Sequence, residues 1–267
     1  MAILSVENLH FSYTTGQDIL KGITLQFDRR PTAIIGQNGA GKTTFAKLLK
    51  GLLKPLHGDV YVKGVNTKET TAAQLARQIG LVFQNPHDQI FKSKVIDEVM
   101  FGPLNLKQEK ETARANAIEA LHMVGMENKL DKNPYDLGLS EQKLICIASV
   151  LAMQPEIVIF DEPTIAQDYP ARERIKEIIQ HLRQKGKLVL TITHDMDFAA
   201  AVFERTIVFA QGRVLLDGTT REVFAERELL KHAHVEPPHV TQLGQKLGCR
   251  ETFLTAEEWI RYKRRKS

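Results

Sequence analysis

Residues 36–44 limit what this chain can fold into more than any other segment. They read Gly-Gln-Asn-Gly-Ala-Gly-Lys-Thr-Thr and fit the pattern G-x-x-x-x-G-K-[ST]. Glycines let backbone N–H groups approach a phosphate, Lys42 supplies a point charge for the β- and γ-phosphates, and the Thr43 hydroxyl can bind Mg²⁺. The segment therefore predicts a nucleotide-binding loop. The residues expected to contact the nucleotide are Gln37, Asn38, Gly39, Ala40, Gly41, Lys42, Thr43 and Thr44.

The sequence on either side of this loop supports the same interpretation. Residues 32–35, Thr-Ala-Ile-Ile, predict a short buried strand before the loop, and residues 44–49 predict a helix after it. A phosphate in the loop would then lie at a helix N-terminus, where unpaired N–H groups favour an anion. A glycine-rich turn without a ligand is the alternative interpretation.

Composition excludes several classes of protein. The chain has 267 residues, of which 43% are hydrophobic and 25% charged, as in ordinary globular proteins. Its apolar runs have the length of strands, whereas a membrane span needs about 20 apolar residues. Residues 1–5 carry no basic segment, so we expect no secretory signal. Cys146 and Cys249 lack metal-ligand spacing, which favours reduced thiols in a cytosolic protein.

The charge of the chain is only slightly basic. The net charge is +4, and much of the excess lies in residues 261–266. A solvated basic tail is the simplest interpretation, and contact with an anionic membrane surface or an acidic partner is the alternative. A nucleic-acid surface would need basic and aromatic residues interleaved across one face. Because that pattern is not seen, we expect no nucleic-acid partner.

Hydrophobic patterns predict two kinds of sheet. Apolar and polar residues alternate over 6–13 and 22–27, which predicts antiparallel strands. Apolar runs at 157–160 and 188–192, separated by a helical pattern, predict a parallel α/β core, and residues 205–218 predict a closing hairpin. The predicted fold class is therefore α/β, with a mostly parallel core sheet and an antiparallel β subdomain.

The middle of the chain has a different character. Residues 110–124 place apolar side chains at helical spacing, and Pro103 and Pro134 are expected to break the chain around such helices. The predicted parts are a nucleotide-binding core with the antiparallel subdomain (1–84 and 156–218), a helical subdomain (85–155) and a C-terminal extension (219–267). We expect the extension to be a dimer contact.

Two adjacent carboxylates follow the apolar run at 157–160. Asp161 is placed to hold the Mg²⁺ shell, and Glu162 is placed to polarise an attacking water as general base. His194 follows the run at 188–193 and is a candidate contact for the γ-phosphate. An Asp-Glu pair often marks only a turn, and a lone His is usually structural. The phosphate loop upstream favours the catalytic interpretation.

In this order the motifs resemble those of the ATP-binding cassette (ABC) ATPases, the motors of ABC transporters, and the similarity covers nearly the whole chain. Tyr13 matches the A-loop aromatic that stacks on adenine, residues 36–44 match Walker A, Gln84 matches the Q-loop, Asp161 and Glu162 match Walker B, Asp168 matches the D-loop aspartate, and His194 matches the switch histidine. The resemblance implies an ABC-type P-loop NTPase that hydrolyses ATP. It also implies Mg²⁺ held by Thr43, Gln84 and Asp161.

A narrower resemblance concerns residues 80–91, 97–106 and 229–248. These segments are similar to the ATPases of energy-coupling factor (ECF) transporters, the group that includes cobalt and nickel importers. The resemblance implies a peripheral protein on the cytoplasmic side of the cell membrane, powering uptake of a vitamin or a transition-metal ion. Its implied partners are a second ABC ATPase, a membrane coupling protein and a small substrate-binding membrane protein. The region of Gln84 would form the groove for the coupling protein.

The pattern breaks at the family's LSGGQ signature, which acts across a dimer interface. Without a gap, the signature falls on residues 137–141, Leu-Gly-Leu-Ser-Glu. Leu139 and Ser140 then replace the two glycines, and Gly138 replaces the serine. That serine holds the partner's γ-phosphate, and losing a hydroxyl bond to a charged group costs about 1.5–3 kcal/mol. Donation by Ser140 in its place is the alternative, although its hydroxyl would project differently around the helix. Gln167 is a second departure, because the D-loop usually has Leu there.

These departures favour an asymmetric heterodimer in which this chain's own Walker motifs carry most of the hydrolysis. Tolerated drift with two working sites is the alternative. Two other functions compete with an importer ATPase. Soluble ABC ATPases that act on DNA or ribosomes carry long coiled-coil insertions or tandem cassettes, which this sequence does not contain. A non-catalytic structural subunit would not need the intact Lys42 and Glu162.

Overall fold

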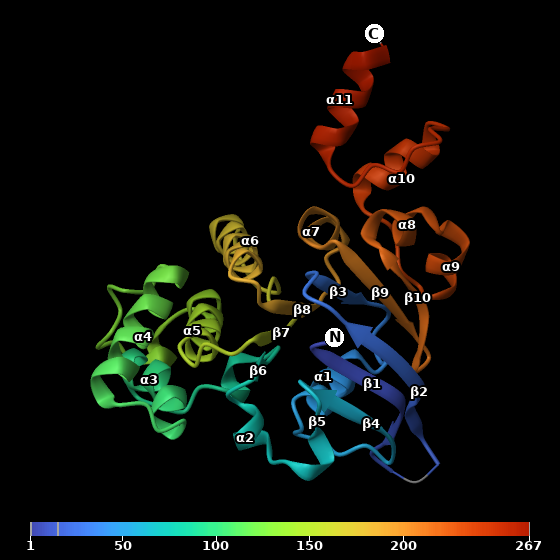
Figure 1. Ribbon diagram of the computed structural model, residues 1–267. Coiled ribbons are helices and arrows are strands. Elements are labelled where there is room, and N and C mark those ends of the chain that lie inside the picture. Colours follow the sequence, from blue (N-terminus) through green and yellow to red (C-terminus); the bar gives the residue numbers. More distant parts are fainter. Residues whose placement is uncertain (1, 15, 267) are drawn as a thin grey trace.

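The computed structural model describes residues 2–14 and 16–266 and contains two β-sheets (Figure 1). The four-stranded antiparallel sheet has the order β2-β1-β4-β5 and comprises β1 (Leu4–Ser12), β2 (Asp18–Phe27), β4 (His57–Val62) and β5 (Val65–Asn66). The six-stranded sheet has the order β10-β9-β3-β8-β7-β6 and comprises β3 (Thr32–Ile35), β6 (Ile79–Val82), β7 (Ile157–Asp161), β8 (Leu188–Ile192), β9 (Arg205–Ala210) and β10 (Arg213–Thr219). All its pairings are parallel except β9 with β10, which confirms the predicted fold class.

The six-stranded sheet is covered on both faces, because its strands alternate apolar side chains between two cores. Ile157 and Ile159 of β7 join the core that contains α1 (Lys42–Leu49) and the antiparallel sheet. Val158 and Phe160 of the same strand join the core formed with the helices on the opposite face. Period-two alternation in a fully buried strand thus fixes which residues face α1.

Three helices form a group beside the β6 edge of the sheet, coloured green in Figure 1. They are α3 (Val95–Asn105), α4 (Lys110–Val124) and α5 (Leu139–Leu151). The helix predicted at 110–124 is confirmed to the residue, but the predicted break at Pro103 is wrong. Pro103 lies inside α3, near its C-terminal end. The missing N–H there costs a single hydrogen bond, and the burial of α3 against α4 and α5 compensates for it.

The remaining helices occupy the core and the C-terminal part. They are α2 (Ala72–Leu75), α6 (Tyr169–Gln184), α7 (Met196–Val202), α8 (Thr220–Ala225), α9 (Arg227–His232), α10 (His239–Lys246) and α11 (Ala256–Lys266). Phe253, in the segment between α10 and α11, packs its ring against those of Trp259 and Tyr262 on α11. At the start of α10, His239 contacts Asp197 of α7, which ties this part to the core. Within residues 2–14 and 16–266, no helix combines the length and the apolar character that crossing a bilayer requires.

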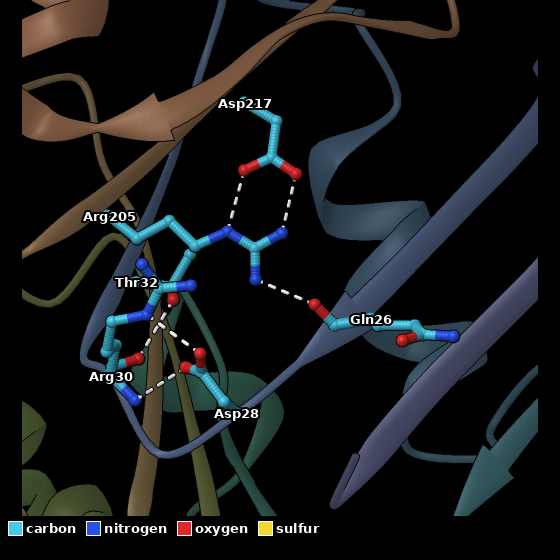
Figure 2. A network of polar contacts seen from close by, with 6 residues as sticks. All are labelled: Gln26, Asp28, Arg30, Thr32, Arg205 and Asp217. Atoms are coloured by element: carbon cyan, nitrogen blue, oxygen red, sulfur yellow. Dashed lines mark hydrogen bonds and ion pairs between the residues drawn. The ribbon is translucent and has the colours of Figure 1, made fainter. Parts of the chain in front are cut away.

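A polar network joins the two sheets near the start of β3 (Figure 2). The Arg205 guanidinium on β9 donates to both carboxylate oxygens of Asp217 on β10, at 2.6 and 2.5 Å. It also donates to the Gln26 carbonyl of β2 at 2.7 Å, so one side chain bridges both sheets. Asp28 accepts from the Arg30 N–H at 2.9 Å and stabilises the turn into β3. The strand that carries the phosphate loop is therefore anchored at its entry.

Candidate nucleotide and hydrolysis site

The loop between β3 and α1 requires glycine at two positions. Gly36 has φ 144°, and a Cβ there would lie 2.1 Å from the Phe209 carbonyl oxygen. Gly41 has φ 96°, and a Cβ there would meet a Leu20 methyl at 2.6 Å. Gly41 also precedes α1 and offers no side chain to cap it. The N–H groups of the first turn are therefore available to an anionic ligand.

Lys42 curls back over this loop. Its ammonium donates to the Gly36 carbonyl at 2.7 Å and to the Gln37 carbonyl at 3.0 Å. Burial lowers the pKa of Lys42, and the nearby carboxylates of Glu162 and Asp161 partly oppose that shift. Because both of these hydrogen bonds go to neutral carbonyls, this buried ammonium would be stabilised further by an anion, which a nucleotide phosphate would provide.

A cavity of about 300 Å³ brings most of the predicted residues together. Its lining is Ile19, Asn38, Gly39, Gly41, Lys42, Thr43, Thr44, Gln84, Glu162, Ile192 and His194. Tyr13 stands at its margin, with its hydroxyl 3.3 Å from the Thr44 hydroxyl and its ring 58% exposed. Gln37, Ala40 and Asp161 do not line the cavity, and Ile19 and Ile192 are lining residues that the motifs did not indicate.

Asp161 is the buried carboxylate at the end of β7. Burial raises the pKa of Asp161, and the nearby Thr43 side chain partly opposes that shift. Its Oδ1 is fully buried and has no hydrogen-bond partner among the described residues. An unpaired carboxylate oxygen near Thr43, together with Thr43 and Gln84 in the cavity lining, supplies the kind of oxygen donors that Mg²⁺ prefers. These residues fit the ion that the sequence predicts.

Glu162 occupies a constrained backbone position with φ 50°. Its N–H donates to the Ile192 carbonyl at 3.0 Å, and its Oε2 accepts from the His194 N–H at 3.2 Å. The ring Nε2 of His194 lies 3.1 Å from Oε1. Burial raises the pKa of Glu162 to about 7, which suits a general base near neutral pH. Burial also lowers the pKa of His194, which favours its neutral ring.

The N-terminal end of α5 differs from the phosphate loop. The Gly138 N–H donates to the Glu141 carboxylate at 3.2 Å, so this chain supplies its own anion there. The Ser140 hydroxyl donates to the Gln167 amide oxygen at 2.9 Å. The two departures from the family pattern therefore contact each other, which the sequence did not predict. Asp168 caps α6 through the Ala171 N–H at 2.9 Å.

Sequence reasoning also missed Lys143 on α5. Its side chain is almost fully buried, and its ammonium donates to the backbone carbonyls of Phe83 and Gln84. The one available signal was a lysine directly before the apolar run Leu144-Ile145-Cys146-Ile147-Ala148. A helix with so little polar surface buries all its sides, and a lysine in it needs internal partners.

Comparison with known proteins places these observations in a family. The profile described as "ABC transporter" matches residues 20–165. The energy-coupling factor transporter ATP-binding protein EcfA of Methanocaldococcus jannaschii is 37% identical over 256 residues, covering 95% of this chain and 92% of that protein. The chain belongs to the ABC transporter ATPases, as its sequence resemblance indicated, and several of its relatives are named energy-coupling factor transporter ATP-binding proteins.

Solved structures agree with this assignment. The cbiO1 protein of Clostridium perfringens, described as part of the ABC transporter complex cbiONQ, is 32% identical with a TM-score of 0.75, covering 92% of this chain and 99% of that one. A dimeric ATP-binding cassette in a post-hydrolysis state bound to ADP and Pi is 28% identical with a TM-score of 0.75, covering 82% of this chain and 99% of that one.

Proposed function

We propose that this chain is the ATP-hydrolysing subunit of an ECF-type importer and binds a membrane coupling protein on the cytoplasmic side of the cell membrane. An exposed aromatic pair carries this proposal. Phe91 and Phe101 are 53% and 36% exposed, and their rings meet edge to face with centroids 4.6 Å apart. Exposed Leu104 adds to this apolar patch. Phe91 follows Gln84 along the chain, so a helix docked there would contact the nucleotide-sensing segment.

The patch is held in a fixed shape, as a binding surface should be. The buried Glu98 carboxylate accepts from the N–H groups of Phe91 at 3.0 Å and Lys92 at 2.8 Å. The Lys92 ammonium lies 5.1 and 4.8 Å from the centroids of the Phe91 and Phe101 rings. Preorganisation of this kind lowers the conformational cost of binding a partner.

The experiment is copurification of the chain with the membrane proteins expressed alongside it. Phe91→Asp with Phe101→Asp should abolish recovery of the coupling protein and of the small substrate-binding membrane protein, while ATP binding by the isolated chain is unchanged. Leu56→Asp is the matched control, because Leu56 is equally exposed but lies in the antiparallel part of the molecule. Equal recovery with both variants contradicts the docking site. A wild-type chain that recovers no membrane protein favours a soluble, non-transport ATPase.

Within this importer, we assign roles to the residues of the cavity. Thr43, Gln84 and Asp161 would hold Mg²⁺, which when bound neutralises charge on the β- and γ-phosphates. Glu162 takes the proton of the attacking water, and His194 orients that water against the γ-phosphate. Tyr13 stacks on adenine at the margin of the cavity. The transported compound, a vitamin or a transition-metal ion, is selected by another subunit.

The second ATPase of the importer is proposed to be a different chain. Leu139, the first residue of α5, is 53% exposed where a signature would contact the partner's phosphate. Glu141 places a carboxylate at the same end of the helix. Three exposed apolar residues support the C-terminal extension as a further contact between the two ATPases: Leu243 on α10, Leu247 directly after it and Ile260 on α11. An intact partner signature would complete the cavity of this chain.

Replacing the general-base glutamate of each ATPase in turn, in the reconstituted complex, tests this asymmetry. Glu162→Gln should nearly abolish ATP hydrolysis and import, whereas the equivalent change in the partner should leave a substantial rate. A fully active homodimer of this chain contradicts the asymmetric assignment. Full activity of the complex with Glu162→Gln would instead indicate a non-catalytic structural subunit.

A further inference from the structure

Lys143 is a buried charge that the hydrolysis machinery does not use. Its side chain is 2% exposed in the second turn of α5. Among the described residues it forms no ion pair with a carboxylate. Instead, its ammonium donates to the Phe83 carbonyl at 2.9 Å and also to the Gln84 carbonyl. A buried ammonium is costly unless its donors are satisfied, so these two carbonyls cannot leave it without a large penalty.

A second link runs beside the first. The Gln89 side-chain oxygen accepts from the Phe83 N–H at 3.1 Å, and its NH₂ donates to the Cys146 carbonyl at 2.9 Å. Lys143 and Cys146 are one turn apart on the same face of α5. The C=O of Phe83 is thus bound to Lys143 of α5, and its N–H is bound to Gln89, which is itself bound to α5. We therefore expect segment 83–89 to move together with α5.

We propose that Lys143 is a positioning residue that locks the Gln84 segment to α5, so that this chain's own nucleotide site and the signature end of α5 move as one unit. The inference rests on the proposed role of Gln84 in the nucleotide site. The unit would extend from the Gln84 segment, which follows the C-terminal end of β6, to the N-terminal end of α5. Lys143 acts through the backbone of Gln84 and does not touch the nucleotide.

The first measurement is hydrogen exchange on the isolated chain, which requires no transporter. Lys143→Met removes the charge and both hydrogen bonds with little change in volume. It should speed amide exchange in residues 83–89 about tenfold or more, since bonds to a charged donor are lost. Its melting temperature should be unchanged or higher, because a desolvated charge is gone. Lys143→Gln keeps a donor and should recover part of the protection.

Gln142→Met is the matched control, because Gln142 is also buried on α5 but donates to the Leu137 carbonyl at 2.8 Å. It should leave exchange of residues 83–89 unchanged. Unchanged exchange in Lys143→Met, or equal loss in both variants, overturns the proposal. These outcomes do not depend on whether the chain drives an importer.

The second measurement is a double-mutant cycle in the complex with the partner ATPase. Lys143→Met should lower kcat about tenfold and change KM for ATP less than about twofold, because ATP contacts are intact. With Gln84→Ala already present, adding Lys143→Met should cause little further loss, since both act through one segment. Additive losses would show that Lys143 acts elsewhere and would overturn the proposal. A complex without ATPase activity would count against the proposed function and leave the exchange result standing.

Discussion

The N-terminal ends of α1 and α5 resemble each other in outline and differ in chemistry. Each helix follows a glycine, Gly41 for α1 and Gly138 for α5. At α1 no side chain caps the first turn, so its N–H groups are open to a ligand. At α5 the Glu141 carboxylate already binds the Gly138 N–H, and Leu139 is exposed beside it. The N-terminal end of α1 is open to an external phosphate, whereas an N–H at the N-terminal end of α5 is already bound by a carboxylate of the same chain.

This contrast shows that a helix N-terminus is not by itself a phosphate site. The partial positive charge at the end of a helix attracts any anion, including a carboxylate of the same helix. The Glu141 carboxylate also pairs with the Lys129 ammonium at 3.5 Å, and it occupies the Gly138 N–H that an approaching phosphate would otherwise use. The Ser140 hydroxyl does not compensate, because it donates to Gln167. The contrast thus supports the proposal of a weak composite site at α5, whereas the cavity beside α1 keeps this chain's own phosphate-loop residues together with Gln84, Glu162 and His194.

The strongest test of this contrast neutralises one carboxylate in each region, Glu162 in the cavity beside α1 and Glu141 at the start of α5. Glu162→Gln should slow ATP hydrolysis by the complex about 100-fold or more while ATP still binds, because general-base contributions reach 10²–10⁴. Glu141→Gln should leave the rate unchanged or raise it. Phosphate release and nucleotide binding are the two measurements. Near-normal turnover with Glu162→Gln would place the base elsewhere.

A second test replaces the glycine before each helix by alanine. At Gly41 the backbone has φ 96° and a Cβ would meet Leu20, so Gly41→Ala should weaken ATP binding by about 1–3 kcal/mol, or 5- to 150-fold in Kd. At Gly138 φ is −65° and the nearest atom to a Cβ, a Glu141 oxygen, is 3.9 Å away. Gly138→Ala should leave ATP binding within about twofold. Similar losses in both variants would refute the contrast; calorimetric titration with ATP measures both.

Local patterns predicted several elements, among them the strand that precedes the phosphate loop. The strand at 32–35 and the helix at 110–124 are confirmed to the residue. A strand buried on both faces reads as a short apolar run, and a helix buried on one face repeats its apolar residues at helical spacing. The Asp161–Glu162 pair falls at the end of its strand as predicted, because parallel strands end at the same edge of the sheet. The functional roles of these residues and the domain boundaries stay predictions.

Contacts between distant segments could not be predicted in this way. Lys143 reads as a surface residue, and only the packing of α5 against segment 83–89 gives its ammonium two carbonyl partners. The departures at Ser140 and Gln167 were recognised separately, but their hydrogen bond depends on how α5 meets the loop before α6. Pro103 was misjudged because tertiary packing outweighs one lost helix bond.

The third prediction concerns a variant in which the signature at the N-terminal end of α5 is restored. Restoring Ser, Gly and Gly at positions 138, 139 and 140 removes Leu139, breaks the Ser140–Gln167 bond and returns a hydroxyl to the phosphate. Recovery of about 1.5 kcal/mol, the lower value for a bond to a charged group, should raise turnover at that composite site about tenfold. The rate is best measured with the other site silenced by Glu162→Gln. An unchanged rate would show that the α5 end was never limiting.

The smallest expected effect concerns Tyr13, at the margin of the cavity beside α1. Tyr13 is 58% exposed, and its ring meets Phe11 edge to face while one face stays open to adenine. Tyr13→Ala should raise the Kd for ATP about fivefold, corresponding to roughly 1 kcal/mol for an aromatic stack. Tyr13→Phe is the control, because it keeps the ring and loses only the hydroxyl contact with Thr44 at 3.3 Å. If the ring stacks on adenine, Phe restores the affinity; if the hydroxyl orders the loop through Thr44, Phe and Ala weaken binding equally. Equal loss would assign Tyr13 to the support of α1 and leave adenine to another side chain.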